Sequence, residues 1–167
     1  MIAGVDVGRR KDRTAVVVID GGNVIFAGEI SAARFRQQAG QLVPILRQCR
    51  LSVVDITGMG IGIGEALEDL GARVIGVTIT AGQSITRNDD GGYNVGKLIL
   101  MGILRAAIMD RKLMIDREKP WAIPLAHQLL QLSATQTRKS YKVEAKKGHD
   151  DLALAAALAL FGSTLNV

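Results

Sequence analysis

Apolar residues alternate with small or polar residues through the first thirty positions of the chain. Residues 2–7 (IAGVDV), 14–19 (TAVVVI) and 24–30 (VIFAGEI) each predict a strand, since β-branched residues dominate them. The sequence Asp20–Asn23 (DGGN) between the last two has the composition of a tight hairpin turn. We therefore predict that the chain opens with a three-stranded antiparallel meander.

Helical periodicity and shorter strands follow the meander. Ser31 is predicted to cap a helix over residues 32–47. A strand is predicted over residues 51–57 (LSVVDIT), then a helix over 64–70 and a strand over 73–77. This strand–helix–strand order predicts a parallel crossover unit.

The second half of the chain is predicted to be mainly helical. Residues 80–93 show no periodicity and are predicted to form a loop. The elements predicted after this loop are a helix at 94–109, an extended segment at 112–115, a helix at 121–132, and a hairpin at 135–138 and 141–145.

Residues 152–161 (LALAAALALF) are apolar on every side, which predicts a buried helix. Asp150 and Asp151 stand at its start, and an unpaired charge at the edge of a core is costly unless a metal ion or another cation compensates it. A dense basic run precedes the two carboxylates, comprising Arg138, Lys139, Lys142, Lys146 and Lys147. Carboxylates beside a basic strip indicate metal-dependent chemistry on a polyanion.

Composition adds limits to this picture. The 167 residues are 48% apolar and 22% charged, which predicts one α/β domain over residues 1–167. A net charge of +5 permits nucleic-acid binding without requiring it. The single cysteine, Cys49, excludes a cysteine-based zinc site and fits a reducing cytoplasm. The apolar run at 152–161 is too short to span a bilayer, so we expect a soluble protein without membrane contact.

Two further aspartates lie in predicted strands, where Asp is depleted. Asp6 shares a strand face with Gly4 and Gly8, which leaves room for a ligand to approach its carboxylate. Asp55 precedes the glycine-rich run 58–64 (GMGIGIG). That run lacks the Lys-Ser/Thr of a P-loop, so we interpret it as a tight turn that gives access to Asp55.

Adjacent strands lie about 4.8 Å apart, so Asp6 and Asp55 converge if their strands are neighbours. Carboxylates gathered with Asp150 and Asp151 would repel one another unless divalent cations lie between them. Carboxylate ligands suit Mg²⁺ or Mn²⁺, and a pair of such ions catalyses in-line displacement at phosphorus.

The order of elements and acidic residues resembles the RNase H-like nuclease superfamily. Within it, the chain resembles the nuclease domain of the large terminase subunit of tailed bacteriophages. The segments that carry the resemblance span nearly the whole chain and are GVDVGRRKDRTAVVVID, VVDITGMG, YNVGKLILMGILRAAIMDRKLMI and KKGHDDLALAAALAL.

This resemblance implies an RNase H-like fold, with a central mixed sheet flanked by helices. It implies an endonuclease that uses two Mg²⁺ or Mn²⁺ ions to cut concatemeric phage DNA during genome packaging in the cytoplasm of a bacterial host. By position, Asp6, Asp55 and Asp151 would be the ligand triad, with Asp150 as an auxiliary ligand and His149 positioning water or phosphate. The implied partners are double-stranded DNA and a packaging ATPase domain, small terminase subunit or portal.

Two departures from the family qualify the resemblance. The sequence has no P-loop ATPase, which implies an isolated domain or a free-standing nuclease. The loop after Asp6 is RRKDR, where many relatives have a Gly/Pro-rich turn. We predict a DNA cradle that comprises Arg9, Arg10, Lys11, Arg13, Arg138, Lys139, Lys142, Lys146 and Lys147, with Arg87 and Lys97 as further contacts. The alternative for each basic run is a solvated turn.

Three other functions remain open at this stage. A Holliday-junction resolvase shares the fold and the acidic last helix. An actin-like or sugar-kinase-like nucleotide-binding module shares Asp-x-Gly at Asp6–Gly8 and a glycine loop, although 167 residues leave little space for its second subdomain. A non-catalytic DNA-binding domain would not need the four carboxylates.

Overall fold

The computed structural model describes residues 1–8, 13–31, 34–136, 141–145 and 150–166. The strands of its central sheet are β1 (Ile2–Asp6), β2 (Thr14–Asp20), β3 (Asn23–Ile30), β4 (Leu51–Asp55), β5 (Val74–Thr80), β6 (Ile85–Arg87), β7 (Tyr93–Gly96) and β8 (Met114–Ile115). The helices are α1 (Phe35–Leu46), α2 (Ile61–Asp69), α3 (Lys97–Met109), α4 (Ala122–Gln131) and α5 (Asp151–Thr164). A 3-10 turn, η1 (Gly58–Gly60), precedes α2, and β9 (Leu132–Gln136) and β10 (Tyr141–Ala145) form a separate two-stranded sheet.

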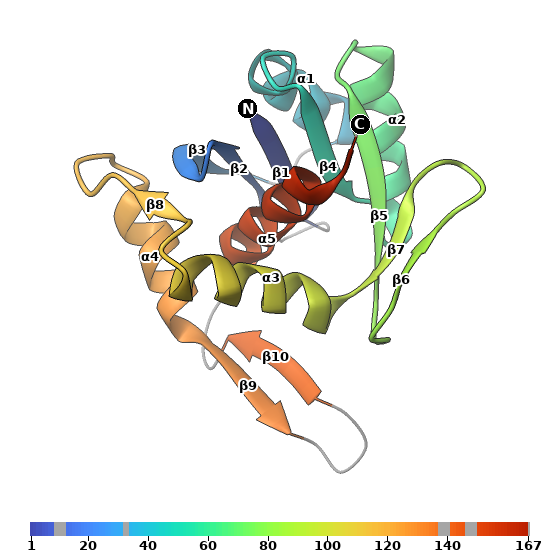
Figure 1. Cartoon of the computed structure of the whole chain (residues 1–167). Helices are drawn as coiled ribbons and strands as arrows, with labels where there is room; N and C mark the ends of the chain where they lie inside the picture. The colour runs from blue at the N-terminus through green and yellow to red at the C-terminus, as the bar shows by residue number, and fades with distance from the viewer. Residues whose placement is uncertain (9–12, 32–33, 137–140, 146–149, 167) are drawn as a thin grey trace.

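The central sheet is mixed, with helices on both faces (Figure 1). Its strand order is β6-β7-β5-β4-β1-β2-β3-β8. The β1–β2–β3 meander is antiparallel, whereas β4 and β5 run parallel beside β1. Both the predicted fold class and the parallel crossover through α2 are therefore confirmed.

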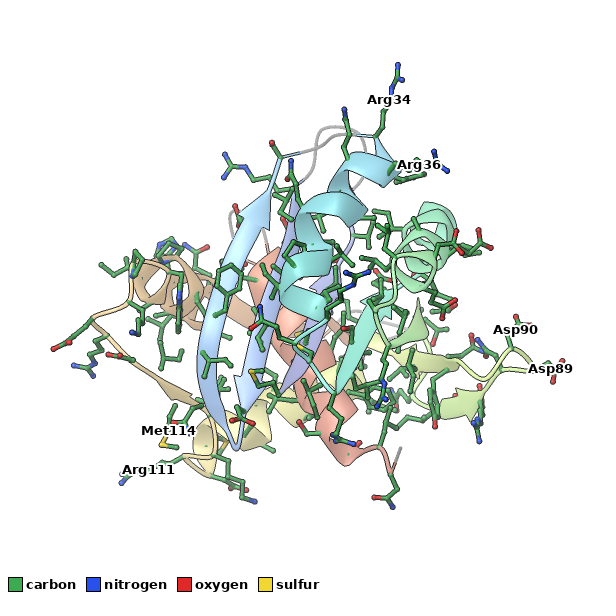
Figure 2. The ribbon with its side chains drawn as sticks, turned by 90° about the horizontal axis from the view of Figure 1, so that it is seen from above. Arg34, Arg36, Asp89, Asp90, Arg111 and Met114 are labelled. Carbon is green, nitrogen blue, oxygen red and sulfur yellow. The ribbon has the colours of Figure 1, made fainter. Side chains whose placement is uncertain are left out.

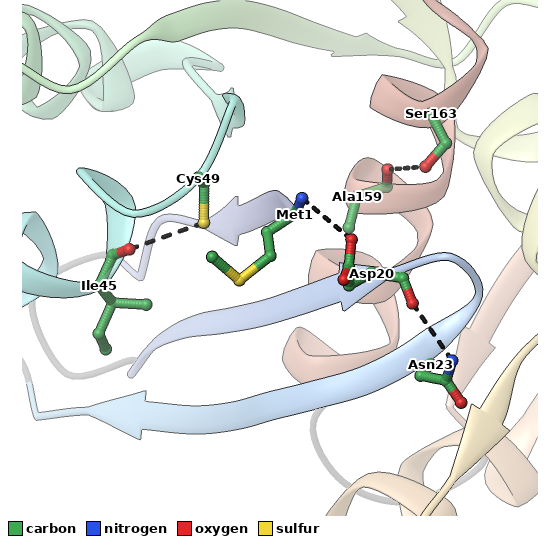
Figure 3. Close-up of polar contacts among 7 residues, drawn as sticks. All are labelled: Met1, Asp20, Asn23, Ile45, Cys49, Ala159 and Ser163. Atoms are coloured by element: carbon green, nitrogen blue, oxygen red, sulfur yellow. Dashed lines mark hydrogen bonds and ion pairs between the residues drawn. The ribbon is translucent and has the colours of Figure 1, made fainter.

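The hairpin between β2 and β3 turns at Gly21 and Gly22, whose φ angles of 53° and 87° lie in the left-handed region that favours glycine. Polar contacts reinforce this end of the sheet (Figure 3). The Met1 ammonium lies 3.1 Å from the Asp20 carboxylate, and the Asn23 side chain donates a hydrogen bond of 3.4 Å to the Asp20 carbonyl. These contacts hold together the end of the meander that is opposite to Asp6.

Alternation along the strands produces two apolar cores. Side chains such as Val5 and Val54 pack against α1 and α2 on one face of the sheet. The other face, with residues such as Val17 and Val53, packs against α5 and its neighbours α3 and α4. Helix α5 is buried throughout residues 152–159, as its apolar sequence predicted.

The predicted loop over residues 80–93 is wrong in part, because β6 and β7 form a hairpin there. Strand β7 pairs parallel with β5, so the sheet extends two strands further than predicted. Asp89 and Asp90 mark the tip of this hairpin, at the opposite side of the molecule from Arg111 and Met114 (Figure 2). Residues 94–96 belong to β7, so α3 begins at Lys97 and not at 94, because sheet pairing outweighs the weak helical periodicity of these residues.

Two helix starts also differ from the prediction. Arg34, not Ser31, is the N-cap of α1, and its backbone N–H donates to the Gln37 side chain at 3.4 Å. Helix α2 begins at Ile61, directly after η1, instead of at residue 64. Gly62 and Gly64 therefore belong to the first turn of α2 and not to the loop before it.

The other predicted elements are present, but the first strand of the last hairpin, β9, covers Leu132–Gln136 and not 135–138, and residues 137–138 lie outside the described residues. Helix α4 and the extended segment β8 lie close to the predicted positions, and β8 pairs parallel with β3. The β9–β10 hairpin projects from the body of the molecule beyond α3 and α4 (Figure 1). None of the helices in the described part of the chain is long and apolar enough to cross a membrane.

Candidate metal centre

Asp6 and Asp55 end two neighbouring parallel strands. The last paired residues of β1 and β4 are Val5 and Val54, so the two aspartates follow side by side, one residue further along. Val5 and Val54 belong to the core under α1 and α2. Alternation therefore directs both carboxylates to the other face, where α5 lies.

Helix α5 brings Asp150 and Asp151 to the same edge of the sheet. Its N-cap is Asp150, and Asp151 is its first residue. The helix packs directly over β1 at Gly4, where a Cβ atom would lie 1.9 Å from the Ala155 carbonyl oxygen. The prediction that Gly4 leaves room for a ligand is wrong, because the backbone of α5 occupies this space.

Electrostatic interactions connect all four aspartates. The pKa of Asp6 is raised well above its ordinary value, chiefly because the carboxyl is buried. The negative charges of Asp55, Asp151 and Asp150 raise the pKa further, in that order, and the Lys97 ammonium opposes them. The predicted acidic residues are thus gathered around Asp6.

Lys97 was predicted to contact DNA, but in the structure its side chain pairs with an aspartate of the acidic cluster. Its Nζ lies 2.8 Å from Oδ2 of Asp150, and this ion pair joins the first residue of α3 to the N-cap of α5. The ammonium is therefore directed into the acidic cluster. Sequence reasoning missed this pairing, although a lysine in the first turn of a predicted helix is itself an unusual signal.

The backbone around Asp55 is held by a tight turn. The Thr57 N–H donates to Oδ1 of Asp55 at 2.8 Å, and the Thr57 hydroxyl oxygen accepts from the Ile79 N–H at 2.8 Å. A Cβ atom on Gly60 would lie 2.3 Å from the Asp55 carbonyl oxygen, so the chain passes directly over Asp55. Of the glycine-rich run predicted as a turn, residues 58–60 form the turn η1 beside Asp55, whereas residues 61–64 belong to α2. The access to Asp55 that this turn was expected to give stays a prediction.

Gln128 of α4 is a second residue that the sequence did not reveal. Its Oε1 accepts a hydrogen bond of 2.8 Å from the Leu152 N–H, in the first turn of α5. Its Nε2 donates to Glu29 at 3.1 Å, and Glu29 accepts from Arg13 at 3.0 Å. Arg13, a predicted DNA contact, is thus ion-paired with Glu29 in this structure.

Most of the predicted DNA cradle lies outside the described residues. These residues are Arg9, Arg10, Lys11, Arg138, Lys139, Lys146 and Lys147. His149, predicted to position water or phosphate, also lies outside the described residues. Lys142 lies on β10, where its backbone position pairs with Thr135. Its placement on the projecting hairpin is compatible with the predicted cradle.

The donor chemistry around Asp6 fits a hard divalent cation. Among the described residues, no group of three or more His, Cys, Asp or Glu side chains forms a preassembled metal site. The four carboxylates are nevertheless close enough to oppose ionisation of Asp6. Divalent cations relieve this kind of repulsion, and oxygen ligands favour Mg²⁺ or Mn²⁺.

Solved structures with a similar fold include terminase nucleases. The large terminase nuclease of thermophilic phage G20c with bound magnesium superposes with a TM-score of 0.75, over 96% of this chain and 79% of that one, at 19% identity. A variant nuclease domain of the large terminase subunit of bacterial virus Sf6, with manganese and β-thujaplicinol, has a TM-score of 0.75 at 12% identity, over 95% of this chain and 86% of that one.

This chain has the terminase-nuclease fold. The likeness extends over nearly the whole chain and includes the RNase H-like mixed sheet predicted from the sequence. No protein-family model matches the sequence, and no curated protein matches it. At these identities the terminase-nuclease fold is what the comparisons show, and the chemistry must be argued from the residues of this chain.

Proposed function

We propose that this chain is a divalent-metal-dependent DNA endonuclease of the terminase type. One observation carries the proposal: Asp6 lies half-buried at the end of β1, and three further aspartates raise its pKa. A concentration of negative charge at one edge of a sheet is costly to stability, so it indicates a functional site. The bound magnesium and manganese of the two similar structures support the same choice of metal.

Asp6, Asp55 and Asp151 would hold the two metal ions, with Asp150 as an auxiliary ligand. When bound, such ions activate the attacking water and stabilise the leaving oxygen of a phosphodiester. The chain itself orients the ligands. The Thr57 N–H fixes one oxygen of the Asp55 carboxylate, and Gln128 fixes the first turn of α5 next to Asp151.

The substrate that we propose is double-stranded DNA held through its phosphates. The net charge of +5 and the basic residues around the β9–β10 hairpin supply the electrostatic attraction. Phosphate contacts carry no sequence information, so binding should tolerate many sequences and weaken steeply with salt. Cutting of concatemeric genomes, with a packaging ATPase domain, small terminase subunit or portal as partner, is the biological role that this activity would serve.

Cleavage of a supercoiled plasmid tests the proposal. The wild type, Asp6→Asn, Asp151→Asn and the control Asp89→Asn, at the β6–β7 hairpin tip, are compared in Mn²⁺, Mg²⁺ and EDTA. We expect nicking or linearisation by the wild type and Asp89→Asn in metal only, and a loss of at least about 100-fold in the two site variants. Cutting that persists in EDTA or in both site variants would refute the proposed centre.

Substrate choice is tested with the same proteins. Linear duplex should be cut at least as fast as a four-way junction of the same sequence. Strong preference for the junction would indicate a resolvase instead, and tight ATP binding without cleavage would indicate a nucleotide-binding module.

A further inference from the structure

Lys97 and Asp150 both stand at the start of a helix, and neither has the usual role of a residue at that position. Lys97 is the first residue of α3, where the helix dipole disfavours a positive charge. Asp150 is the N-cap of α5, a position where Asp normally accepts a backbone hydrogen bond, yet its side chain makes no capping bond. Both side chains instead form the ion pair that links the two helices.

The pair is also less exposed than an ordinary surface ion pair. The side chains of Lys97 and Asp150 are 33% and 23% exposed, and their charged atoms lie 2.8 Å apart. The comparable pair of Lys112 and Asp110, at the end of α3, is 74% and 55% exposed at 3.1 Å. Partial burial reduces solvent screening, so the charge of Lys97 acts more strongly on its surroundings.

The surroundings of Lys97 are the acidic cluster itself. Its ammonium interacts with Asp6 against the repulsion from the other three aspartates. Among the described residues, Lys97 is the cation whose charge lowers the pKa of Asp6. Lys97 therefore supplies part of the positive charge that a divalent ion would otherwise supply.

We propose that Lys97 is a built-in counter-cation that competes with divalent metal for Asp150. Without metal, it binds Asp150 and reduces the repulsion among the four carboxylates. Metal entry at Asp150 then requires displacement of the ammonium from this carboxylate. This inference rests on the proposed metal-dependent function and adds a residue that sets the affinity of the metal centre.

Competition predicts opposite effects of Lys97 on two measurable quantities. Removal of its charge should lower the stability of the metal-free protein, because the carboxylates lose their counter-cation. The same change should strengthen metal binding, because Asp150 becomes available and a repulsive charge is lost. A purely structural ion pair would lower stability equally with and without metal.

Thermal unfolding and calorimetric titration with Mn²⁺ alone separate these cases. The proteins are the wild type, Lys97→Met, Lys97→Arg and the matched control Lys112→Met. We expect Lys97→Met to unfold at a lower temperature in EDTA, to gain more from Mn²⁺ than the wild type, and to bind Mn²⁺ about 10-fold more tightly. Lys97→Arg keeps the cation and should stay close to the wild type, as should Lys112→Met.

A double-mutant cycle tests whether the effect passes through Asp150. The gain in Mn²⁺ affinity from Lys97→Met should shrink in an Asp150→Asn background. An unchanged or weaker Mn²⁺ affinity of Lys97→Met would overturn the proposal, as would an equal loss of stability with and without metal.

These outcomes are distinct from failure of the proposed function. If the wild type binds Mn²⁺ and cuts plasmid while Lys97→Met has the same Mn²⁺ affinity, only the role of Lys97 is refuted. If neither the wild type nor Lys97→Met binds Mn²⁺, both proposals fail.

Discussion

Gly4 of β1 lies directly against the backbone of Ala155 in α5. A Cβ atom at Gly4 would be 1.9 Å from the Ala155 carbonyl oxygen and 2.5 Å from the Ala159 nitrogen. Because Gly4 has no side chain, the backbone of α5 can lie directly against the backbone of β1 at this point. Asp6 is two residues beyond this contact, and Asp151 is one helical turn before it. The contact therefore sets the separation of the two carboxylates.

We predict that Gly4→Ala weakens both stability and metal-dependent cleavage. The added methyl group must push α5 away from β1, and overpacking of this kind costs about 1–3 kcal/mol. The control is Gly102→Ala, since a Cβ there meets nothing within 4 Å on an exposed face of α3. Chemical denaturation should show Gly102→Ala unchanged or more stable. Equal stability of Gly4→Ala and the wild type would contradict the close contact.

Gln128→Met should loosen the first turn of α5. The Leu152 N–H loses its acceptor, which costs about 1–3 kcal/mol if the group stays buried. Because Asp151 adjoins Leu152, we also expect Mn²⁺ affinity to fall about 10-fold. Gln131→Met, one turn further along α4 and bonded to His127, is the control. A calorimetric titration in which both variants bind Mn²⁺ like the wild type would rule out a positioning role for Gln128.

Asp6→Asn should abolish cleavage and yet stabilise the metal-free protein at neutral pH. Burial and the neighbouring aspartates raise the pKa of Asp6, so the folded state holds this proton more tightly than the unfolded chain does. The free energy of unfolding therefore falls as the pH rises from the ordinary value of 3.8 through the raised pKa. Asparagine cannot ionise, so this decrease is lost in the variant.

The stabilisation by Asp6→Asn should depend on pH and on metal. Measured in EDTA, the difference from the wild type should be largest at neutral pH and should shrink toward pH 3.8. Mn²⁺ should reverse its sign, because only the wild type gains from binding. A constant difference across pH would mean that ionisation of Asp6 does not destabilise the folded, metal-free protein. Asp89→Asn at the exposed hairpin tip serves as the control.

Helices α2 and α3 end in the same way but with different residues. Gly71 and Arg111 each follow the last turn with a positive φ, 82° and 54° respectively, and their N–H groups donate back to Glu68 and Ile108. An arginine in this conformation is strained. Arg111 lies at the edge of the molecule, on the opposite side from the β6–β7 hairpin tip at Asp89 and Asp90 (Figure 2).

Arg111→Gly should therefore stabilise the protein by about 0.5–1 kcal/mol, without an effect on cleavage. The reciprocal change, Gly71→Ala, should destabilise by a similar amount. Denaturation curves of the two variants provide the comparison. Destabilisation by Arg111→Gly would show that the side chain makes a contact that outweighs the backbone strain.

The sequence predicted those parts of the fold whose signals are local. The β-branched runs of β1 to β3 and the uniformly apolar α5 have one reading each, so their strands and buried helix were correct. Strands β6 and β7 were missed because they are short and mostly polar. Their strand conformation depends on pairing with β5, which no local pattern shows.

In the candidate site, too, the residues with a local sequence signal were predicted and the contacts between distant residues were not. The four aspartates were predicted because Asp is unusual in a strand and at the start of an apolar helix. Gln128 and Lys97 were not assigned their contacts, since their partners are 24 and 53 residues distant along the chain. The space beside Gly4 was misjudged for the same reason: only the packed structure shows that Ala155 fills it.

The packing of α5 on β1 also determines when the acidic centre can exist in the life of the molecule. A ribosome makes the strand that ends in Asp6 well before the helix that begins with Asp151. Until that helix leaves the exit tunnel, the sheet face under it has no cover and Asp6 has no neighbours from α5. A nascent chain that still lacks α5 therefore carries no assembled centre, and the docking of α5 on the sheet is the event that creates one.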